Sequence, residues 1–266
     1  MVFSNINLDH EFANNAWANG SRDHSGIFLE RKTAAARAYF EYIPIRLYPE
    51  DLGSPIYRKF EVGNLFELIM LDTRIYRDVT DTFDPRIVKD PTRTILGKQQ
   101  EKWLDELPTT NTSWSLYGNQ VMFAVILQSI HEMGFPFIVD GWDAYYHSRK
   151  RMISYIHDRK KNTGSSPVII SGDIHVSVYN KIQEIPEIIT PAIASLSIES
   201  QIVARSLETL LRTTRENIWS NMHDKGFVLF DIYNEHIDVQ WIHVTARTEI
   251  PDHTYQIGHH IRLEKS

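Results

Sequence analysis

The sequence predicts a single α/β domain that ends in a β-hairpin, and three observations support this fold class. Three short, almost wholly apolar runs are typical of strands that are covered on both faces. Amphipathic segments of helical periodicity lie between and around these runs. Near the C-terminus, two segments alternate apolar and polar residues around a turn, as in a hairpin with one solvent-facing side. With no internal repeat or low-complexity linker, residues 1–266 are expected to form one domain.

These patterns place the expected elements along the chain. Pro44 and Pro108 end the first two helices, because proline cannot continue a helix. The expected helices are Glu30–Ile43, Leu96–Leu107, Ser148–Lys161 and Ser200–Ile218, and the polar segment Asp78–Pro91 is expected to be a loop. The expected strands are Val2–Ile6, Leu65–Leu71, Ser113–Tyr117 and Pro167–Ser171, and the expected hairpin pairs Phe227–Tyr233 with Ile237–Val244.

Helical periodicity also predicts which side chains of two helices face inward. The helix at Ser148–Lys161 is expected to bury Met152, Ile153 and Ile156 and to expose a basic outer face. The first helix is expected to bury one face, made of Ala34, Ala35, Ala38, Tyr39 and Tyr42.

Composition excludes several classes of protein. A formal net charge of −6 makes a nucleic-acid binder that neutralises phosphates an unfavoured class. The chain has no cysteine, which excludes disulfides, thiolate nucleophiles and cysteine-ligated zinc. Met1–Asn7 does not resemble a signal peptide, and no run approaches the ~18 apolar residues of a membrane span.

The clearest candidate site is the segment V-I-I-S-G-D-I-H at Val168–His175. A buried strand is expected to end here, and open α/β sheets bind ligands at the carboxyl ends of their strands. Asp173 and His175 are two residues apart, so in extended geometry both side chains point the same way. A carboxylate beside an imidazole suits a metal ion. The alternative is that His175 only ends the strand, with Asp173 as its hydrogen-bond partner.

A second candidate lies near the N-terminus, in D-H-E-F-A-N-N at Asp9–Asn15. Asp9 is a potential metal ligand, and His10 beside it is a potential general acid for a leaving alkoxide. The alternative is an ordinary helix N-terminus, with Asp9 as the cap and Glu11 in the first turn.

Two further expected strands end in polar side chains. Asn119, in G-N-Q, offers an oxygen ligand, although a turn is the alternative for this tripeptide. Arg74 and Arg77 are placed to bind phosphate as bidentate donors. Their alternative is an ion pair with Asp72 that locks the loop.

The aromatic loop D-G-W-D-A-Y supplies Trp142 and Asp143 as potential walls of a substrate pocket. The alternatives are that Trp142 anchors the loop and that Asp143 caps the following helix. Each motif taken singly has such a structural alternative. Because Asp, His, Asn and Arg recur at several strand ends, the pattern as a whole favours a metal site.

Several segments, in the same order along the chain, resemble the motifs of the PhoD-type alkaline phosphatase family, a branch of the calcineurin-like metallophosphoesterases. Long motifs in the correct order are more specific than any one of them. The similar segments are D-H-E-F-A-N-N-A-W at Asp9–Trp17, R-K-T-A-A-A-R-A-Y-F-E-Y-I-P-I-R at Arg31–Arg46, L-D-T-R-I-Y-R at Leu71–Arg77, L-G-K-Q-Q-E-K-W-L at Leu96–Leu104, and then G-N-Q-V-M, D-G-W-D-A-Y and S-G-D-I-H.

The resemblance implies a fold, a cofactor and a site. The implied fold is a partial calcineurin-like metallophosphoesterase sandwich of mixed sheets flanked by helices, with the C-terminal β-hairpin. The implied cofactor is a binuclear or multinuclear metal centre of iron and calcium, with His10 and Asp9 as catalytic residues. The metal ligands would be Asp9, Asn119, Asp173 and His175. A small-molecule phosphate ester would be bound by Arg74, Arg77, Asn14, Trp142 and Asp143.

Two departures from the family pattern bear on activity. Leu8 stands where the family has the first of two aspartates before His-Glu. The first two family motifs have no counterpart here, so the chain is expected to correspond to the C-terminal part of a family member. The resemblance therefore leaves two functions open: a metal-dependent phosphoric ester hydrolase, and a truncated, inactive remnant or binding module of the same fold. Family members are often exported, and the sequence carries no signal for an oligomeric state.

Overall fold

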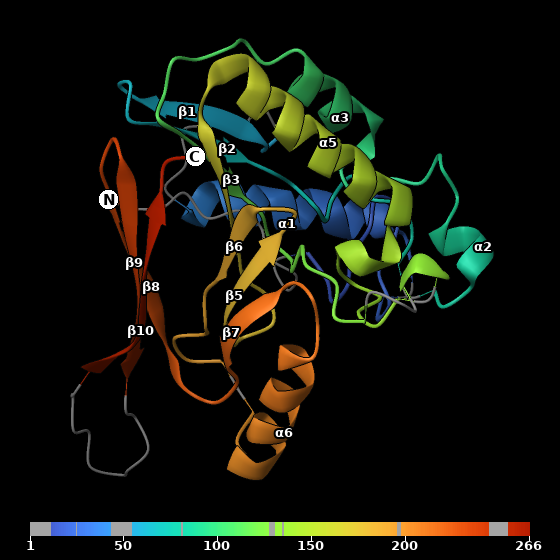
Figure 1. Cartoon of the computed structure of the whole chain (residues 1–266). Helices are drawn as coiled ribbons and strands as arrows, with labels where there is room; N and C mark the ends of the chain where they lie inside the picture. The colour runs from blue at the N-terminus through green and yellow to red at the C-terminus, as the bar shows by residue number, and fades with distance from the viewer. Residues whose placement is uncertain are drawn as a thin grey trace.

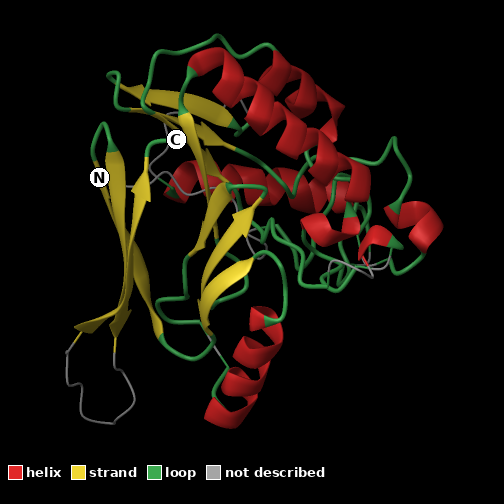
Figure 2. Cartoon of the chain, in the orientation of Figure 1, coloured by secondary structure: helices red, strands yellow, loops and turns green. Residues whose placement is uncertain are grey.

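The fold is built in three layers: helices, a seven-stranded mixed sheet and a three-stranded antiparallel sheet (Figures 1 and 2). A computed structural model describes residues 12–24, 26–43, 55–80, 82–127, 131–134, 136–195, 198–244 and 255–266. The larger sheet contains β1 (Arg58–Val62), β2 (Phe66–Met70), β3 (Trp114–Gly118), β4 (Ser166–Ser171), β5 (Ser177–Ile182), β6 (Ile185–Ile189) and β7 (Asn217–Asn221). Their spatial order is β1-β2-β3-β4-β6-β5-β7, with β2, β3, β4 and β6 parallel to one another.

The smaller sheet pairs β9 (His236–Val244) with β8 (Lys225–Ile232) on one side and β10 (Tyr255–Glu264) on the other. It lies against the larger sheet, on the left in Figure 1. The helices of the described residues are α1 (Phe28–Tyr42), α2 (Pro85–Val88), α3 (Gly97–Asp105), the 3-10 helix η2 (Trp142–Ala144), α5 (Tyr146–Thr163) and α6 (Gln201–Arg212).

Both faces of the central strands are buried, which explains their almost wholly apolar sequences. On one face, Ile69 and Ile169 belong to a core that includes Ile156 of α5. On the other face, Leu116 and Val168 belong to a core that includes Trp241 of β9. The alternation of side chains along a strand therefore divides the sheet into a helix-covered face and a sheet-covered face.

Most of the expected central elements are confirmed. The runs at Leu65–Leu71, Ser113–Tyr117 and Pro167–Ser171 form β2, β3 and β4, and the C-terminal hairpin forms β8 and β9. The expected strand Val2–Ile6 lies outside the described residues.

Two expectations about elements were wrong, and several strands were missed. The helix predicted to reach Ile218 ends at Arg212, and β7 occupies Asn217–Asn221. The polar loop Asp78–Pro91 contains α2, because Asp84 accepts a hydrogen bond from the backbone N–H of Arg86 and Pro85 starts the helix. The strands β1, β5, β6 and β10 were not expected, since their polar and apolar residues give no clear period.

The expected helix faces are only partly correct. In α1, Tyr39 is buried, but Ala34 and Ala38 are exposed and Tyr42 is 83% exposed, because the buried face continues instead through Phe28. In α5, Met152, Ile153 and Ile156 are buried as expected. Arg149 and Arg159 of the same helix are buried as well, so not all of its basic side chains lie on the outer face.

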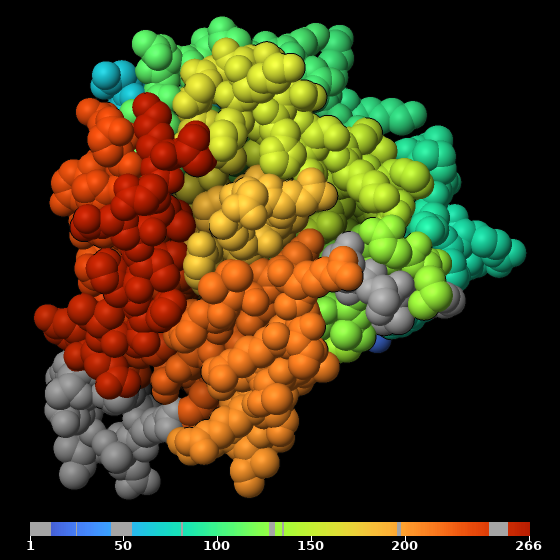
Figure 3. Space-filling model, in the orientation of Figure 1, coloured from blue at the N-terminus to red at the C-terminus, as the bar shows by residue number. Residues whose placement is uncertain are grey.

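The described helices set the outline of the molecule. In Figure 3, α6 projects at the lower end and the three-stranded sheet forms the left side. Among the described residues, no helix combines the length and apolarity that a bilayer crossing requires.

Candidate metal site at the carboxyl edge of the sheet

The carboxyl ends of β2, β3 and β4 meet at one edge of the sheet. Backbone hydrogen bonds join the residues that follow them: Leu71 N–H donates to Gly118 O at 2.8 Å, and Gly172 N–H donates to Gln120 O at 3.2 Å. Parallel pairing brings the three loops together, as the sequence predicts. The motifs that carry Arg74, Asn119 and Asp173 therefore begin side by side.

The loop after β4 is not extended. Asp173 and His175 have φ angles of 73° and 58°, in the left-handed region that few non-glycine residues adopt. The expectation that both side chains share a direction because the segment is a continuing strand was therefore wrong. Left-handed non-glycine residues concentrate at functional sites, where the surrounding structure holds them. This conformation is an independent reason to regard the G-D-I-H loop as a functional site.

Arg74 and Arg77 lie in a buried ion-pair network. Arg74 Nη2 donates to Asp173 Oδ1 at 2.5 Å, and Arg74 Nη1 pairs with Asp140. Arg77 Nη2 donates to Asp140 Oδ1 at 2.6 Å. The ion-pair alternative holds in this structure, although the partners are Asp140 and Asp173 rather than Asp72. Asp140 is thus the carboxylate that fixes both arginines, and phosphate binding by either arginine stays a prediction.

Asp72 shapes the turn that presents these arginines. Its Oδ1 accepts backbone hydrogen bonds from Arg74 at 2.9 Å and from Ile75 at 3.0 Å. Complete burial raises the pKa of Asp72, and these two hydrogen bonds oppose that rise. The turn holds the guanidinium groups toward Asp140, so the position of the network is set by the backbone as well as by charge.

Asn119 is held by hydrogen bonds at both ends of its amide. Its Oδ1 accepts from Trp142 Nε1 at 2.9 Å, and its Nδ2 donates to Ser171 Oγ at 3.0 Å and to the carbonyl of Val121. The side chain is 5% exposed. An amide oxygen has two lone pairs, so the bond from Trp142 leaves one for a metal ion.

Trp142 and Asp143 act within the protein interior. Trp142 is completely buried and packs against Phe123, with ring centroids 4.7 Å apart. Asp143 pairs with His131 Nδ1 at 2.7 Å and accepts the backbone N–H of Ile138 at 3.0 Å. The loop-anchor alternative describes Trp142 in this structure. The capping alternative for Asp143 was wrong, because no side chain caps the start of α5.

The N-terminal candidates are only partly described. Asp9 and His10 lie outside the described residues. Asn14 Nδ2 donates to Asp23 Oδ2 at 2.6 Å, in an exposed pair. Both catalytic assignments and the role of Asn14 therefore stay predictions.

The candidate side chains within the described residues are of chemical types that bind metal ions. Asp173 offers a carboxylate, His175 an imidazole and Asn119 an amide oxygen, which suit a hard cation and a transition metal together. Among the described ranges, no three histidine or acidic side chains gather in one group able to hold an ion. In the part of the chain that is described, the candidate set therefore consists of two such residues and one amide.

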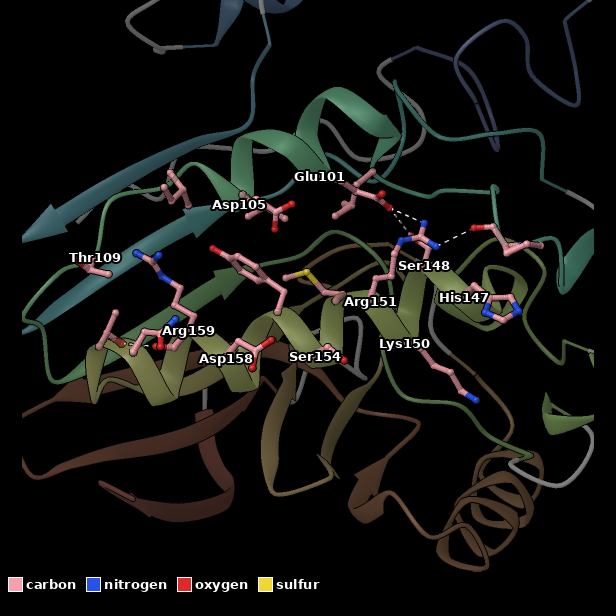
Figure 4. Close-up of a pocket in the computed structure, with 18 residues that line it drawn as sticks. Glu101, Asp105, Thr109, His147, Ser148, Lys150, Arg151, Ser154, Asp158 and Arg159 are labelled. Atoms are coloured by element: carbon pink, nitrogen blue, oxygen red, sulfur yellow. Dashed lines mark hydrogen bonds and ion pairs between the residues drawn. The ribbon is translucent and has the colours of Figure 1, made fainter.

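A groove of about 780 Å³ lies elsewhere, between α3 and α5 (Figure 4). Glu101 of α3 crosses it to Arg151 of α5 at 2.8 Å and to Ser148 at 3.2 Å. None of the candidate residues lines this groove. The groove is separate from the carboxyl edge and plays no part in the predicted site.

Two acidic residues at this edge were missed by sequence reasoning. Asp140 belongs to the D-G-W-D-A-Y motif, and that motif was the available signal. Glu187 is a lone acid within the apolar run of β6, and it accepts hydrogen bonds from the loop after β3. A single glutamate in such a run gives no sequence signal, because it resembles the exposed position of a half-buried strand.

Comparison with known proteins defines the class. The fold is that of an α/β protein whose strand-end loops meet at the carboxyl edge of its sheet, where open α/β sheets bind ligands. The family model described as PhoD-like phosphatase matches residues 5–241, so the chain belongs to the PhoD-like phosphatase family. The resemblance that the motifs indicate is thereby confirmed.

Two relatives extend the comparison. Alkaline phosphatase D of Bacillus subtilis (strain 168) is 34% identical over 185 residues, which cover 64% of this chain and 30% of that protein. The solved structure titled "Structure of PhoD" matches with a TM-score of 0.81 and 24% identity, covering 97% of this chain and 52% of that one. The structural match shows the shared fold. The chain thus spans about half or less of the length of these relatives.

Proposed function

We propose that the chain is a metal-dependent phosphoric ester hydrolase of the PhoD type. The observation that carries this proposal is the meeting of the Arg74, Asn119 and Asp173 loops at one sheet edge, in a chain of the PhoD-like phosphatase family. The name of the relative, alkaline phosphatase D, supports the same chemistry. The substrate class is a small-molecule phosphate ester.

The proposed metal ligands are Asp173 and His175 after β4, Asn119 after β3, and Asp9. Carboxylate and amide oxygens favour calcium, and an imidazole adds a ligand that iron accepts, so we propose iron and calcium. Bound metal ions would polarise the phosphoryl oxygens and stabilise the charge that develops on them.

The protein's own residues would orient the substrate and move protons. His10 would donate a proton to the leaving oxygen or stabilise its developing charge. Arg74 would hold the carboxylate of Asp173 in place through the 2.5 Å ion pair. Arg74, Arg77 and Asn14 are the proposed substrate-binding side chains. Trp142 and Asp143, which are buried, would form the wall of the substrate pocket from the interior side.

Hydrolysis of p-nitrophenyl phosphate with added calcium and iron tests the proposal. We expect Asp173→Ala and His175→Ala each to lose more than about 100-fold in turnover, because even partners outside the ligand set cost 10–100-fold. Asp158→Ala, on the exposed surface of α5, is the matched control and should keep wild-type turnover. Unchanged turnover in both site variants, or no turnover by the wild-type chain with either metal, would contradict the proposal.

A further inference from the structure

Glu187 is a fully buried carboxylate on β6 whose oxygens accept four neutral hydrogen bonds. Phe123 N–H donates to Oε1 at 2.7 Å, and Ala124 N–H donates to Oε2 at 3.0 Å. Ser171 Oγ donates to Oε1 at 2.7 Å, and Asn180 Nδ2 donates to Oε2 at 3.0 Å. The carboxylate thereby joins the loop after β3 to the end of β4.

Burying this carboxylate is costly, and no cationic side chain of the described residues compensates for it. No ion pair joins Glu187 to a lysine, arginine or histidine among the residues that the structure describes. A buried carboxylate without a cation is tolerated only where hydrogen bonds satisfy its oxygens. An apolar residue at this position would avoid that cost. What Glu187 contributes in return is to hold its four hydrogen-bond donors in place.

One of those donors, Ser171, leads directly to the proposed metal ligand Asn119. Ser171 gives its only proton to Glu187, so its oxygen is left to accept the N–H of Asn119 Nδ2 at 3.0 Å. At the other end of the amide, Trp142 Nε1 is only a donor, so it requires the oxygen of Asn119. The acceptor at one end and the donor at the other permit a single orientation of this amide.

The loop after β3 is held by a second acid in the same way. Glu216 accepts the backbone N–H of Val125 at 2.8 Å and pairs with Arg149 at 2.9 Å. Glu216 has a cation, whereas Glu187 holds the residues nearer to Asn119 without one. Of these two acids, Glu187 is therefore the one that binds the loop nearer to Asn119, whose amide also donates to the carbonyl of Val121 within that loop.

We propose that Glu187 is a positioning residue of the metal site: through Ser171 and the backbone of Phe123 and Ala124, it fixes the Asn119 amide with its oxygen available to a cation. The inference rests on the proposed function for the metal itself. The orientation of the amide can be tested without any metal.

Glu187→Gln tests the proposal, because it keeps the shape while it replaces one acceptor oxygen by a donor and removes the charge. The new NH₂ group can take the place of either oxygen. In place of Oε2 it faces the donors of Ala124 and Asn180, and in place of Oε1 it faces the N–H of Phe123 and reverses the hydrogen bond with Ser171. The matched control is Glu67→Gln on β2. Glu67 is equally buried, and Ser115 Oγ donates to it at 2.6 Å, as Ser171 does to Glu187.

The first readout is the indole N–H signal of Trp142 in the nuclear magnetic resonance spectrum, assigned by its loss in Trp142→Phe. In Glu187→Gln we expect this signal to shift and its solvent exchange to quicken about tenfold, as a weakened hydrogen bond implies. Glu67→Gln should leave it unchanged. A Trp142 signal in Glu187→Gln that matches wild type would overturn the inference.

The second readout is calorimetric titration with calcium alone. We expect calcium affinity to fall about 10–100-fold in Glu187→Gln and to stay within about twofold in Glu67→Gln. Wild-type affinity in Glu187→Gln would overturn the inference. If the wild-type chain binds no calcium, the proposed function has failed, and the Trp142 signal alone decides whether Glu187 positions the amide.

A second pair of variants covers the case in which Glu187→Gln fails to fold. Ser171→Ala removes the hydroxyl between Asn119 and Glu187, and Ser115→Ala removes the corresponding hydroxyl beside Glu67. Each loses a hydrogen bond of about 1 kcal/mol, which a stable domain tolerates. Only Ser171→Ala should shift the Trp142 signal, and equal spectra for the two variants would contradict the inference.

Discussion

Two buried glutamates on the helix-covered face of one sheet are held in opposite ways. Glu67, on β2, is bound by Arg159 at 2.7 and 2.6 Å, so a cation balances its charge. Glu187, on β6, is bound by backbone, hydroxyl and amide donors. Both side chains are completely buried.

The difference appears in the pKa of each carboxyl group. Burial raises the pKa of Glu67, but the hydrogen bonds from Arg159 and Ser115, with the charge of Arg159, bring it below its ordinary value. Burial raises the pKa of Glu187 above its ordinary value, and its neutral hydrogen bonds offset only part of that rise. Glu67 is thus part of a structural ion pair, whereas Glu187 holds loops near the candidate site at a cost in stability.

The largest expected effect follows from removing the cation beside Glu67. Arg159→Met should lower the free energy of unfolding by about 3–5 kcal/mol, because it removes the hydrogen-bonded cation of a buried carboxylate and leaves only Lys59 Nζ, at 3.8 Å, as a cationic partner. Urea denaturation measures this loss.

Lys161→Met is the control for Arg159→Met, since Lys161 is an exposed residue of the same helix and should change stability by no more than about 0.5 kcal/mol. A loss below about 1 kcal/mol for Arg159→Met would mean that the pair contributes little and that the comparison is mistaken.

The next effect is a difference in pH dependence. The ordinary carboxyl pKa is 4.5 for both residues. The pKa of Glu67 is lowered in the folded protein. Wild type is therefore expected to be more stable than Glu67→Gln above pH 4.5, and this difference in the free energy of unfolding is lost as the pH falls below 4.5. The pKa of Glu187 is raised in the folded protein. The stability of wild type relative to Glu187→Gln is therefore expected to be greatest below pH 4.5 and to decline as the pH rises.

Urea denaturation of the three proteins across acidic to neutral pH measures these two differences, each on the order of 1–3 kcal/mol. Opposite slopes are expected. Slopes of the same sign would show that the two glutamates do not differ in the way that their partners indicate.

The central sheet could be predicted from the sequence because its strands are buried on both faces. Leu65–Leu71 and Pro167–Ser171 are apolar for this reason, and their strand-end motifs fall at the expected edge. The strand β5 was missed because the sequence of Ser177–Ile182 mixes Ser, Asn and Lys with apolar residues. The end of α6 was placed too late because Ile218 continues the apolar pattern of the helix into β7.

The partners within the candidate site could not be predicted in the same way. Arg74 meets Asp140 and Asp173, which lie 66 and 99 residues further along the chain. Charge and spacing indicate that an arginine needs a partner, but not which carboxylate the fold brings to it. The positive φ of Asp173 was equally hidden, because it depends on the tertiary packing around the loop.

The most direct test of the account is the metal content of the purified chain. Elemental analysis should find about two metal ions per wild-type chain, and Asp173→Asn and His175→Ala should each retain less than half of that content. Wild-type content in both variants, or no metal in the wild-type chain, would contradict the claim that this edge of the sheet holds the metal ions.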